Sequence, residues 1–175
     1  LGLAPVEATI NFGHVLIDSL ALQQAIRTTE IENIDLVPCN SKIETAEQFL
    51  PLRTGYQSIL KHAIESAQPL KYDYILFDCP PALGAITLNA LTASTLVIIP
   101  TQAEYFSAYA LRNMMSIIRR VREDNNPNLA YRILVTLLDR RNRTHRNIHE
   151  QLRATFGEGV FTATIETDTK LRESP

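Results

Sequence analysis

Short apolar runs recur along the chain and alternate with longer segments in which apolar residues return every three or four positions. The short runs are continuous rather than strictly alternating, which is typical of strands covered on both faces of a parallel sheet. They predict strands over residues 34–38, 72–78, 95–100, 131–138 and 160–165. Because strands alternate with helical segments, the pattern indicates crossover connections and an α/β layered fold.

The longer segments have the periodicity of amphipathic helices. In residues 107–122, for example, Leu111, Met115 and Ile118 lie on one helical face. We expect helices over residues 54–67, 107–122 and 144–156, and shorter ones over residues 14–25, 41–50 and 84–93. In sheets of this class, ligands bind beyond the carboxyl ends of the strands. The polar side chains expected at that edge are Asp78, Thr101, Gln102 and Asp139.

Length and composition agree with an ordinary globular protein. The 175 residues, 45% hydrophobic and 21% charged, can bury a core of their own, and no repeat or low-complexity linker divides them. We therefore expect residues 1–175 to form a single domain. Apolar stretches such as residues 96–99 are far shorter than the roughly 18 residues of a membrane span. No targeting segment opens the chain, so we expect a cytoplasmic protein.

The net charge of −2 conceals an uneven distribution. Residues 112–153 carry ten Lys or Arg against four Asp or Glu, whereas the rest of the chain carries seven against fifteen. The basic region indicates an anionic partner, and a solvated arginine-rich helix face is the alternative. For Arg119, Arg120 and Arg122 we expect the solvated face.

The cysteines and histidines predict no metal centre. Cys39 and Cys79 stand alone, without a CxxC motif or a Cys/His cluster, so we expect buried, reduced thiols. His145 and His149 have a spacing of four residues that is able to bind a metal, but no acidic partner accompanies them. A surface helix face is the better interpretation.

The segment YDYILFDCPPALG, residues 72–84, raises a chemical question because an apolar strand pattern ends on an acid. Burying a charge is costly unless it is paired or binds a metal, but Asp78 at a strand's end can face a cleft and hold a divalent cation through water. Pro80 and Pro81 stiffen the exit, and Gly84 permits close backbone approach or a helix start. A strand-end acid without a metal is the alternative.

This motif stands in a longer series of segments. DCPPALG is followed by TLNALTA, LVIIP and QAEY, is preceded by TEIENIDLVPCN, and leads on to TLLDRRNRTHRNIHEQL, FGEGVFTATI and KLRESP. In this order, and over nearly the whole chain, the segments resemble the ParA family of chromosome and plasmid partition ATPases, a branch that also includes the MinD proteins. The resemblance implies a three-layer α/β fold with a mostly parallel sheet of the P-loop NTPase type.

The resemblance also implies an ATP-dependent switch. Family members bind ATP and Mg²⁺, form a homodimer, bind DNA non-specifically, and hydrolyse ATP slowly when a ParB-type partner stimulates them. They are cytoplasmic and associated with the nucleoid, and no membrane partner is expected. Asp78 falls on the catalytic acid that holds Mg²⁺ through water, and Pro80, Pro81 and Gly84 fall on the switch that senses the nucleotide. Asp139 falls near the adenine base, with a solvated strand-end acid as the alternative.

The resemblance also implies a role for the basic region. Arginines there would contact phosphates, which sets affinity and salt dependence rather than sequence preference. The residues at positions where related proteins contact DNA are Arg140, Arg141, Arg143, Arg146, Lys170 and Arg172.

One family feature is absent. A phosphate-binding loop ends in Gly-Lys-Ser/Thr, and none of the six glycines precedes a lysine. We therefore expect a chain that is truncated at both ends, lacks the N-terminal P-loop strand and helix and the first switch, and by itself neither binds ATP normally nor hydrolyses it. The open edge at residues 74–77 is then expected to be relieved by self-association, strand exchange or a rearranged sheet.

Two other functions stay open. One is a non-catalytic, degenerate relative that binds DNA or a protein without nucleotide. The other is a MinD-like ATPase that positions itself on membranes, which needs a C-terminal amphipathic helix that this chain does not show. The arginines after Asp139 favour DNA over a membrane.

Overall fold

The computed structural model describes residues 10–168. These residues form two compact units, and the boundary between them lies between Ala93 and Ser94. The prediction of a single domain stays a prediction.

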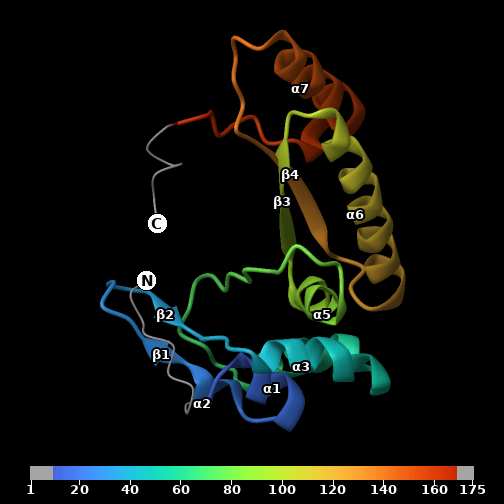
Figure 1. Ribbon diagram of the computed structural model, residues 1–175. Coiled ribbons are helices and arrows are strands. Elements are labelled where there is room, and N and C mark those ends of the chain that lie inside the picture. The colour runs from blue at the N-terminus through green and yellow to red at the C-terminus, as the bar shows by residue number, and fades with distance from the viewer. Residues whose placement is uncertain (1–9, 169–175) are drawn as a thin grey trace. The chain divides into compact units, whose positions relative to one another are not determined.

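The first unit is mainly helical (Figure 1). Its apolar core combines Leu16, Leu50, Leu60 and Ile86, which come from four different segments, so the helices pack around one centre. All the helical segments expected here are present, although the one over residues 14–25 is split by Ser19, which has a left-handed φ of 56°. The helices are α1 (Phe12–Asp18), α2 (Leu22–Ala25), α3 (Lys42–Phe49), α4 (Ile59–Ser66) and α5 (Ala85–Ala93), with 3-10 turns at Leu50–Leu52 and Tyr56–Ser58.

The strand predicted over residues 34–38 is much shorter and belongs to a different sheet. β2 (Asp35–Leu36) pairs antiparallel with β1 (Arg27–Thr28) and not with a parallel neighbour. The turn between them is closed locally, because the Thr29 hydroxyl donates to the carbonyl oxygen of Ile34 over 2.7 Å and accepts from the amide of Ile31 over 3.1 Å. A hairpin of this kind needs no crossover helix.

The prediction of a strand over residues 72–78 is wrong for the described part of the chain. This stretch belongs to none of the strands formed by residues 10–168. Tyr72 is held at its start by a hydrogen bond from its hydroxyl to Asp35, and Phe77 packs against the core at its end. Between them Tyr74 and Leu76 are 85% and 90% exposed. A strand forms only where a neighbour supplies the ladder, and an apolar run alone does not predict that neighbour.

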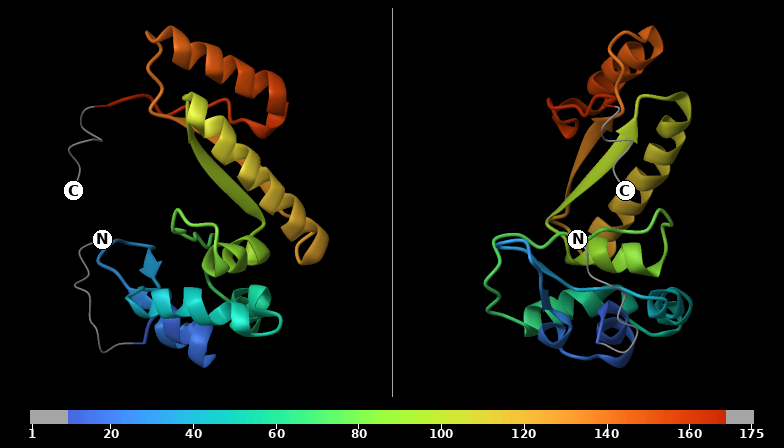
Figure 2. Two further views of the ribbon diagram at one scale, coloured as in Figure 1. Left: turned by 45° about the vertical axis from the view of Figure 1, so that its right-hand side comes forward. Right: turned by 60° about the vertical axis from the view of Figure 1, so that its left-hand side comes forward.

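The second unit has the predicted α/β architecture. β3 (Leu96–Gln102) and β4 (Ala130–Thr136) pair in parallel along their full length, from Leu96 opposite Ala130 to Gln102 opposite Thr136. The crossover is α6 (Tyr105–Asp124), and α7 (Arg143–Phe156) follows β4. Figures 1 and 2 show α6 running along one face of the strand pair. The α/β fold with a parallel sheet is therefore confirmed.

One core joins these elements. Leu111 of α6, Ile133 and Val135 of β4, and Ile148 and Leu152 of α7 are all buried in it. The helices predicted over residues 107–122 and 144–156 are confirmed, because each buries the face on which its apolar residues recur. The opposite face of β3 is more open, with Ile98 48% exposed.

The segment predicted as a strand over residues 160–165 forms β-bridges only at its two ends. Val160 forms a parallel bridge to Ile133, and Glu166 forms one to Leu138. The amides of Phe161 and Ile165 donate to carbonyls of β4 over 2.9 Å each. The segment therefore follows β4 and leaves the ladder between its two anchor points.

The structure bears on the predictions for the two cysteines and for membrane crossing. Both cysteines, Cys39 and Cys79, are free and exposed, so the prediction of buried thiols is wrong. Each lies outside the helices and strands, and its thiol is covered only in part. Within residues 10–168, none of the helices combines the length and the apolar character that crossing a bilayer requires.

Candidate functional site

The loop from Asp78 to Gly84 carries four of the predicted site residues. Asp78, Pro80 and Pro81 are exposed, and Gly84 is half-buried directly before α5. Within the described residues, the Asp78 carboxylate makes no hydrogen bond or ion pair, so its oxygens face solvent. Such a carboxylate fits the coordination of a hydrated divalent cation, whose water ligands need acceptors. Residues 10–168 contain no group of three or more His, Cys, Asp or Glu side chains that would hold a metal directly.

The carboxylate of Asp78 affects the pKa of the next residue, Cys79. Partial burial raises the pKa of the Cys79 thiol, and the Asp78 carboxylate raises it further. The thiol is consequently neutral near pH 7, so it adds no charge to this loop.

A residue outside the predicted set holds the other end of this loop. Glu47 extends from α3 to the start of α5, where its Oε1 accepts from the amide of Ala85 over 2.6 Å and its Oε2 accepts from the amide of Ile86 over 3.0 Å. A carboxylate placed at a helix N-terminus satisfies amides that have no partner in the helix and complements the positive end of the helix dipole. Gly84 lies beside it, and a Cβ at this position would overlap the Glu47 carboxylate.

Two further contacts connect α5 to its surroundings. The Thr87 hydroxyl donates to the carbonyl oxygen of Ala82 over 2.7 Å, which ties the loop to the first turn of the helix. The fully buried Asn89 donates to the carbonyl oxygen of Ala85 over 3.0 Å and accepts from the amide of Leu60 on α4 over 3.1 Å. The helix that follows the loop is thus fixed to α3 and α4.

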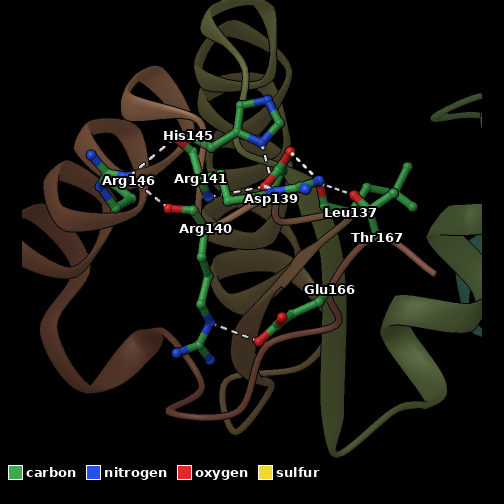
Figure 3. A network of polar contacts seen from close by, with 8 residues as sticks. All are labelled: Leu137, Asp139, Arg140, Arg141, His145, Arg146, Glu166 and Thr167. Atoms are coloured by element: carbon green, nitrogen blue, oxygen red, sulfur yellow. Dashed lines mark hydrogen bonds and ion pairs between the residues drawn. The ribbon is translucent and has the colours of Figure 1, made fainter.

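A second group of predicted residues lies after β4 in the other unit (Figure 3). Asp139, Arg140 and Arg141 line a cavity of about 390 Å³ together with Leu138, Glu166 and Thr167. Because Gln102 and Thr136 are partners at the ends of β3 and β4, this cavity lies at the carboxyl end of the strand pair. Gln102 pairs with Thr136, three residues before Asp139, and the predicted grouping of Asp78, Thr101, Gln102 and Asp139 at one edge stays a prediction.

The loop that carries Asp139 is held by its own side chains. The Asp139 carboxylate accepts from the Arg141 guanidinium over 3.2 Å and from the Arg141 amide over 2.9 Å, and these bonds, the guanidinium first, hold the pKa of Asp139 below its usual value. The amide of Asp139 donates to Nδ1 of His145 over 3.2 Å. Arg146 donates to the carbonyl oxygens of Arg140 and Arg141 over 2.6 and 3.2 Å. These bonds give the cavity a defined wall.

The other wall of the cavity comes from Glu166 and Thr167, which are about 30 residues further along the chain than the end of β4. The Thr167 hydroxyl donates to the carbonyl oxygen of Leu137 over 3.1 Å, and the Thr167 amide donates to that of Leu138 over 3.3 Å. Leu137 has a left-handed φ of 50°, an uncommon conformation for a leucine, so the chain turns sharply where β4 ends. Glu166 forms an ion pair with Arg140 over 2.6 Å.

The predicted DNA-contacting arginines differ in how much of their charge is engaged. Arg140 and Arg141 each pair with a carboxylate, whereas Arg143, the first residue of α7, is exposed and has no ion pair within the described residues. Pairs of this kind at the surface are screened by water and salt and stabilise little, so a phosphate competes with them easily. Lys170 and Arg172 lie outside the described residues. Arg119 and Arg120 are exposed on α6, as expected.

Arg122 has a structural contact that the pattern did not indicate. Its Nε donates to the carbonyl oxygen of Leu129 over 2.7 Å, and its guanidinium lies 5.7 Å from the centre of the Tyr131 ring. The end of α6 is therefore attached to the start of β4 through this side chain.

Sequence reasoning missed Glu47, Asn89, Glu166 and Thr167. Each contacts a residue at least 26 positions away in sequence, and Asn89 also contacts Ala85, four positions away. The one available signal was Gly84, whose missing side chain indicated close approach but did not identify the approaching group.

Comparison with known proteins places these features in a family. A family model described as an AAA domain matches residues 1–131. The sporulation initiation inhibitor protein Soj of Bacillus subtilis is 34% identical over 162 residues, which cover 92% of this chain and 64% of Soj. The chromosome partitioning protein ParA of Caulobacter vibrioides is 31% identical over 177 residues, covering 100% of this chain and 66% of ParA.

A solved structure agrees with the fold. Cobyrinic acid a,c-diamide synthase from Mycobacterium smegmatis, crystallised with an ATP analog and magnesium, superposes with a TM-score of 0.86 at 30% identity and covers 96% of this chain and 68% of its own. The chain thus spans 64% and 66% of the lengths of the two curated relatives.

Proposed function

Because the chain belongs to the ParA/MinD-type family of P-loop partition ATPases, we propose that the complete product of its gene is an ATP-dependent ATPase that segregates chromosomal or plasmid DNA. It binds DNA non-specifically as a homodimer and is stimulated by a ParB-type partner. The observation that carries this proposal is the exposed, unpaired Asp78 carboxylate at the head of a stiff loop whose far end is fixed to α5.

Asp78 is proposed to accept hydrogen bonds from the water shell of Mg²⁺. The bound magnesium nucleotide supplies the phosphoryl group and the charge that stabilises its transfer to water. Pro80 and Pro81 limit the conformations of the loop, and Gly84 lets the backbone approach Glu47. A shift of α5 would therefore also move Asp78. The Gly-Lys pair that would hold the phosphates is absent from this sequence, so the phosphate side of the site is not proposed for these residues.

The cavity beyond β4 is proposed to receive the base of the nucleotide. Asp139 shapes its wall through Arg141, and the backbone of residues 166 and 167 forms the other wall. The crystallised relative with an ATP analog and magnesium supports nucleotide and Mg²⁺ as ligands in this family.

DNA is proposed to meet the basic residues around the start of α7. Arg143 offers an unpaired guanidinium, Arg140 exchanges its exposed partner Glu166 for a phosphate, and Arg141 offers a phosphate the guanidinium N–H groups that Asp139 leaves free. Lys170 is proposed to contribute as a further cation. Such contacts recognise the backbone and carry no sequence preference. A cytoplasmic, nucleoid-associated location follows from this binding.

The test is nucleotide-dependent DNA binding by the complete gene product. We expect the wild-type protein to bind a non-specific duplex more tightly with ATP and Mg²⁺ than with ADP, and Asp78→Ala to abolish that difference. Asp73→Ala is the matched control, because Asp73 is an exposed acid on the same segment.

Two results would contradict the proposal. DNA binding that is equally tight without ATP and unchanged by Asp78→Ala would favour a non-catalytic DNA-binding module. ATP-dependent binding to anionic lipid vesicles, with no binding to DNA, would favour a membrane-positioning ATPase.

A further inference from the structure

We propose that Glu47 is a positioning residue for the loop that carries Asp78. The Glu47 carboxylate on α3 accepts hydrogen bonds from the first two amides of α5. It thereby fixes one end of the loop that carries Asp78, the acid proposed to bind hydrated Mg²⁺. This inference rests on the function proposed above and adds a residue to its machinery.

The contact is stronger than an ordinary helix cap. Both oxygens of one carboxylate accept from consecutive backbone amides, at 2.6 and 3.0 Å, and the acceptor is charged. Charge-assisted hydrogen bonds are roughly twice as strong as neutral ones, and the positive end of the helix dipole adds to them. The start of α5 therefore has one favoured position relative to α3.

Glu47 acts from a rigid platform. The residue before it, Ala46, is fully buried, and Leu50 one turn later is 1% exposed, so α3 is anchored in the core of its unit. On its far side, α5 is fastened to α4 by the buried Asn89. The carboxylate thus joins two elements that are each fixed independently.

Gly84 provides independent support for this role. Its φ lies outside the left-handed region, so glycine is not needed there for backbone conformation. Its nearest neighbours are all atoms of Glu47, and a Cβ would come within 2.6 Å of the Glu47 Cδ. Gly84 is therefore needed because it leaves room for the carboxylate.

The loop between the anchor and Asp78 is short and stiff. Thr87 holds the carbonyl oxygen of Ala82, which leaves only residues 78–81 before the fixed part. Two of those four residues are prolines, each with a φ restricted by its ring. Few torsions can absorb a shift of α5, so a displacement at Ala85 is transmitted to Asp78.

The experiment compares three variants of the complete gene product. Glu47→Gln keeps the shape but removes the charge and turns an NH₂ group toward one amide. Glu47→Ala removes the carboxylate, and Gly84→Ala evicts it without altering it. Glu44→Gln is the matched control, because Glu44 is an exposed acid on the same helix. The measurements are steady-state ATP hydrolysis and hydrogen exchange at the amides of Ala85 and Ile86.

We expect all three variants to accelerate exchange at these two amides by about tenfold, because a charged acceptor is lost. The kcat for ATP hydrolysis is expected to fall by about 10- to 100-fold, since small misplacements of a catalytic group are that costly. The KM for ATP is expected to change less than about threefold, because these contacts do not hold the phosphates. Glu44→Gln leaves all three quantities at wild-type values.

A double variant separates positioning from general damage. Once Glu47 is alanine, Gly84→Ala no longer displaces a carboxylate, so the second substitution is expected to lower kcat by less than about twofold further. A large additional loss in the double variant would overturn the role assigned to Gly84.

Two other outcomes overturn the proposal. Faster exchange at Ala85 and Ile86 with an unchanged kcat would make Glu47 a purely structural cap while leaving the proposed ATPase function intact. A wild-type protein that hydrolyses no ATP would remove the proposed function and this inference together.

Discussion

The side-chain oxygen of Asn89 on α5 accepts the backbone amide of Leu60 on α4 over 3.1 Å, in a part of the first unit where Asn89 is fully buried. Ser58, at the N-cap position of α4, makes no such bond with its own side chain. A residue 29 positions away therefore caps this helix. The same side chain donates to Ala85, so both of its polar groups are satisfied.

Replacing Asn89 with leucine should lower the free energy of unfolding by about 1–3 kcal/mol, because the Leu60 amide and the Ala85 carbonyl both lose a buried partner. Urea denaturation followed by circular dichroism measures this change. Asn113→Leu, at an exposed position on α6, serves as the control and should shift stability by no more than about 0.5 kcal/mol. Equal effects of the two substitutions would contradict the capping role.

The contrast between periodic segments and long-range contacts explains what the sequence could predict. α6 and α7 were predictable because one face of each, with Leu111 and Ile148 as examples, is buried in a core. The same holds for β3 and β4, which find each other through a single crossover helix. Periodicity reports which face is buried, and that information is local.

Residues 72–78 show where local information ends. Their apolar pattern is that of a strand, yet a strand also needs a neighbour, and the described residues provide none. Glu47 was missed for a related reason, because it meets Ala85 and Ile86 across 38 and 39 positions of sequence. Asp78 was identified because its motif resembles that of a family, and its role stays a prediction.

The ion pair between Arg140 and Glu166 predicts a gain of function. Glu166→Gln should strengthen non-specific DNA binding by the complete gene product a few fold, since it frees the Arg140 guanidinium and removes a negative charge nearby. Stability should change by less than about 1 kcal/mol, because both side chains are more than half exposed. Fluorescence anisotropy with a labelled duplex measures the affinity. Weaker or unchanged binding would argue against Arg140 as a phosphate contact, and Glu123→Gln on α6 controls for net charge.

Arg143 should contribute to the salt dependence of DNA binding. Arg143→Ala is expected to reduce the slope of log affinity against log salt concentration by about 1, as expected for one lost phosphate contact. The substitution leaves the cap of α7 in place, because Asn142 supplies it by accepting the amide of Thr144 over 2.9 Å. Arg119→Ala, on the exposed face of α6, should leave the slope unchanged, and an equal effect of both would indicate diffuse charge attraction instead.

Gly157 ends α7 in a conformation that other residues avoid. Its φ is 53° with ψ at −122°, so Gly157→Ala should lower the free energy of unfolding by about 1–3 kcal/mol through backbone strain alone. No atom lies within 4 Å of the added Cβ, which excludes a steric clash as the cause. Denaturant unfolding checks the value. Glu158→Ala, at the next exposed position, should change stability by no more than about 0.5 kcal/mol.

His149 on α7 should make the protein less stable in mild acid. Its Nε2 is buried without a hydrogen-bond partner among the described residues, and burial, followed by the charges of Arg153 and Arg140, lowers its pKa, with Glu150 acting in the opposite sense. The unfolded chain keeps the ordinary value near 6.5, so below that pH it binds more protons than the folded chain does. The contribution of His149 to stability is therefore complete above pH of about 6.5 and is lost as the pH falls toward the lower folded-state pKa.

The corresponding measurement is the free energy of unfolding as a function of pH for wild type and His149→Leu. Both proteins lose stability in acid as carboxylates are protonated, but the wild type should lose more, because only it must protonate the partly buried imidazole whose Nε2 has no partner. His62→Leu, at an exposed position on α4, is the control for the loss of a histidine. If the His149→Leu profile ran parallel to the wild-type profile, the imidazole would have to gain a partner in acid that compensates for its burial.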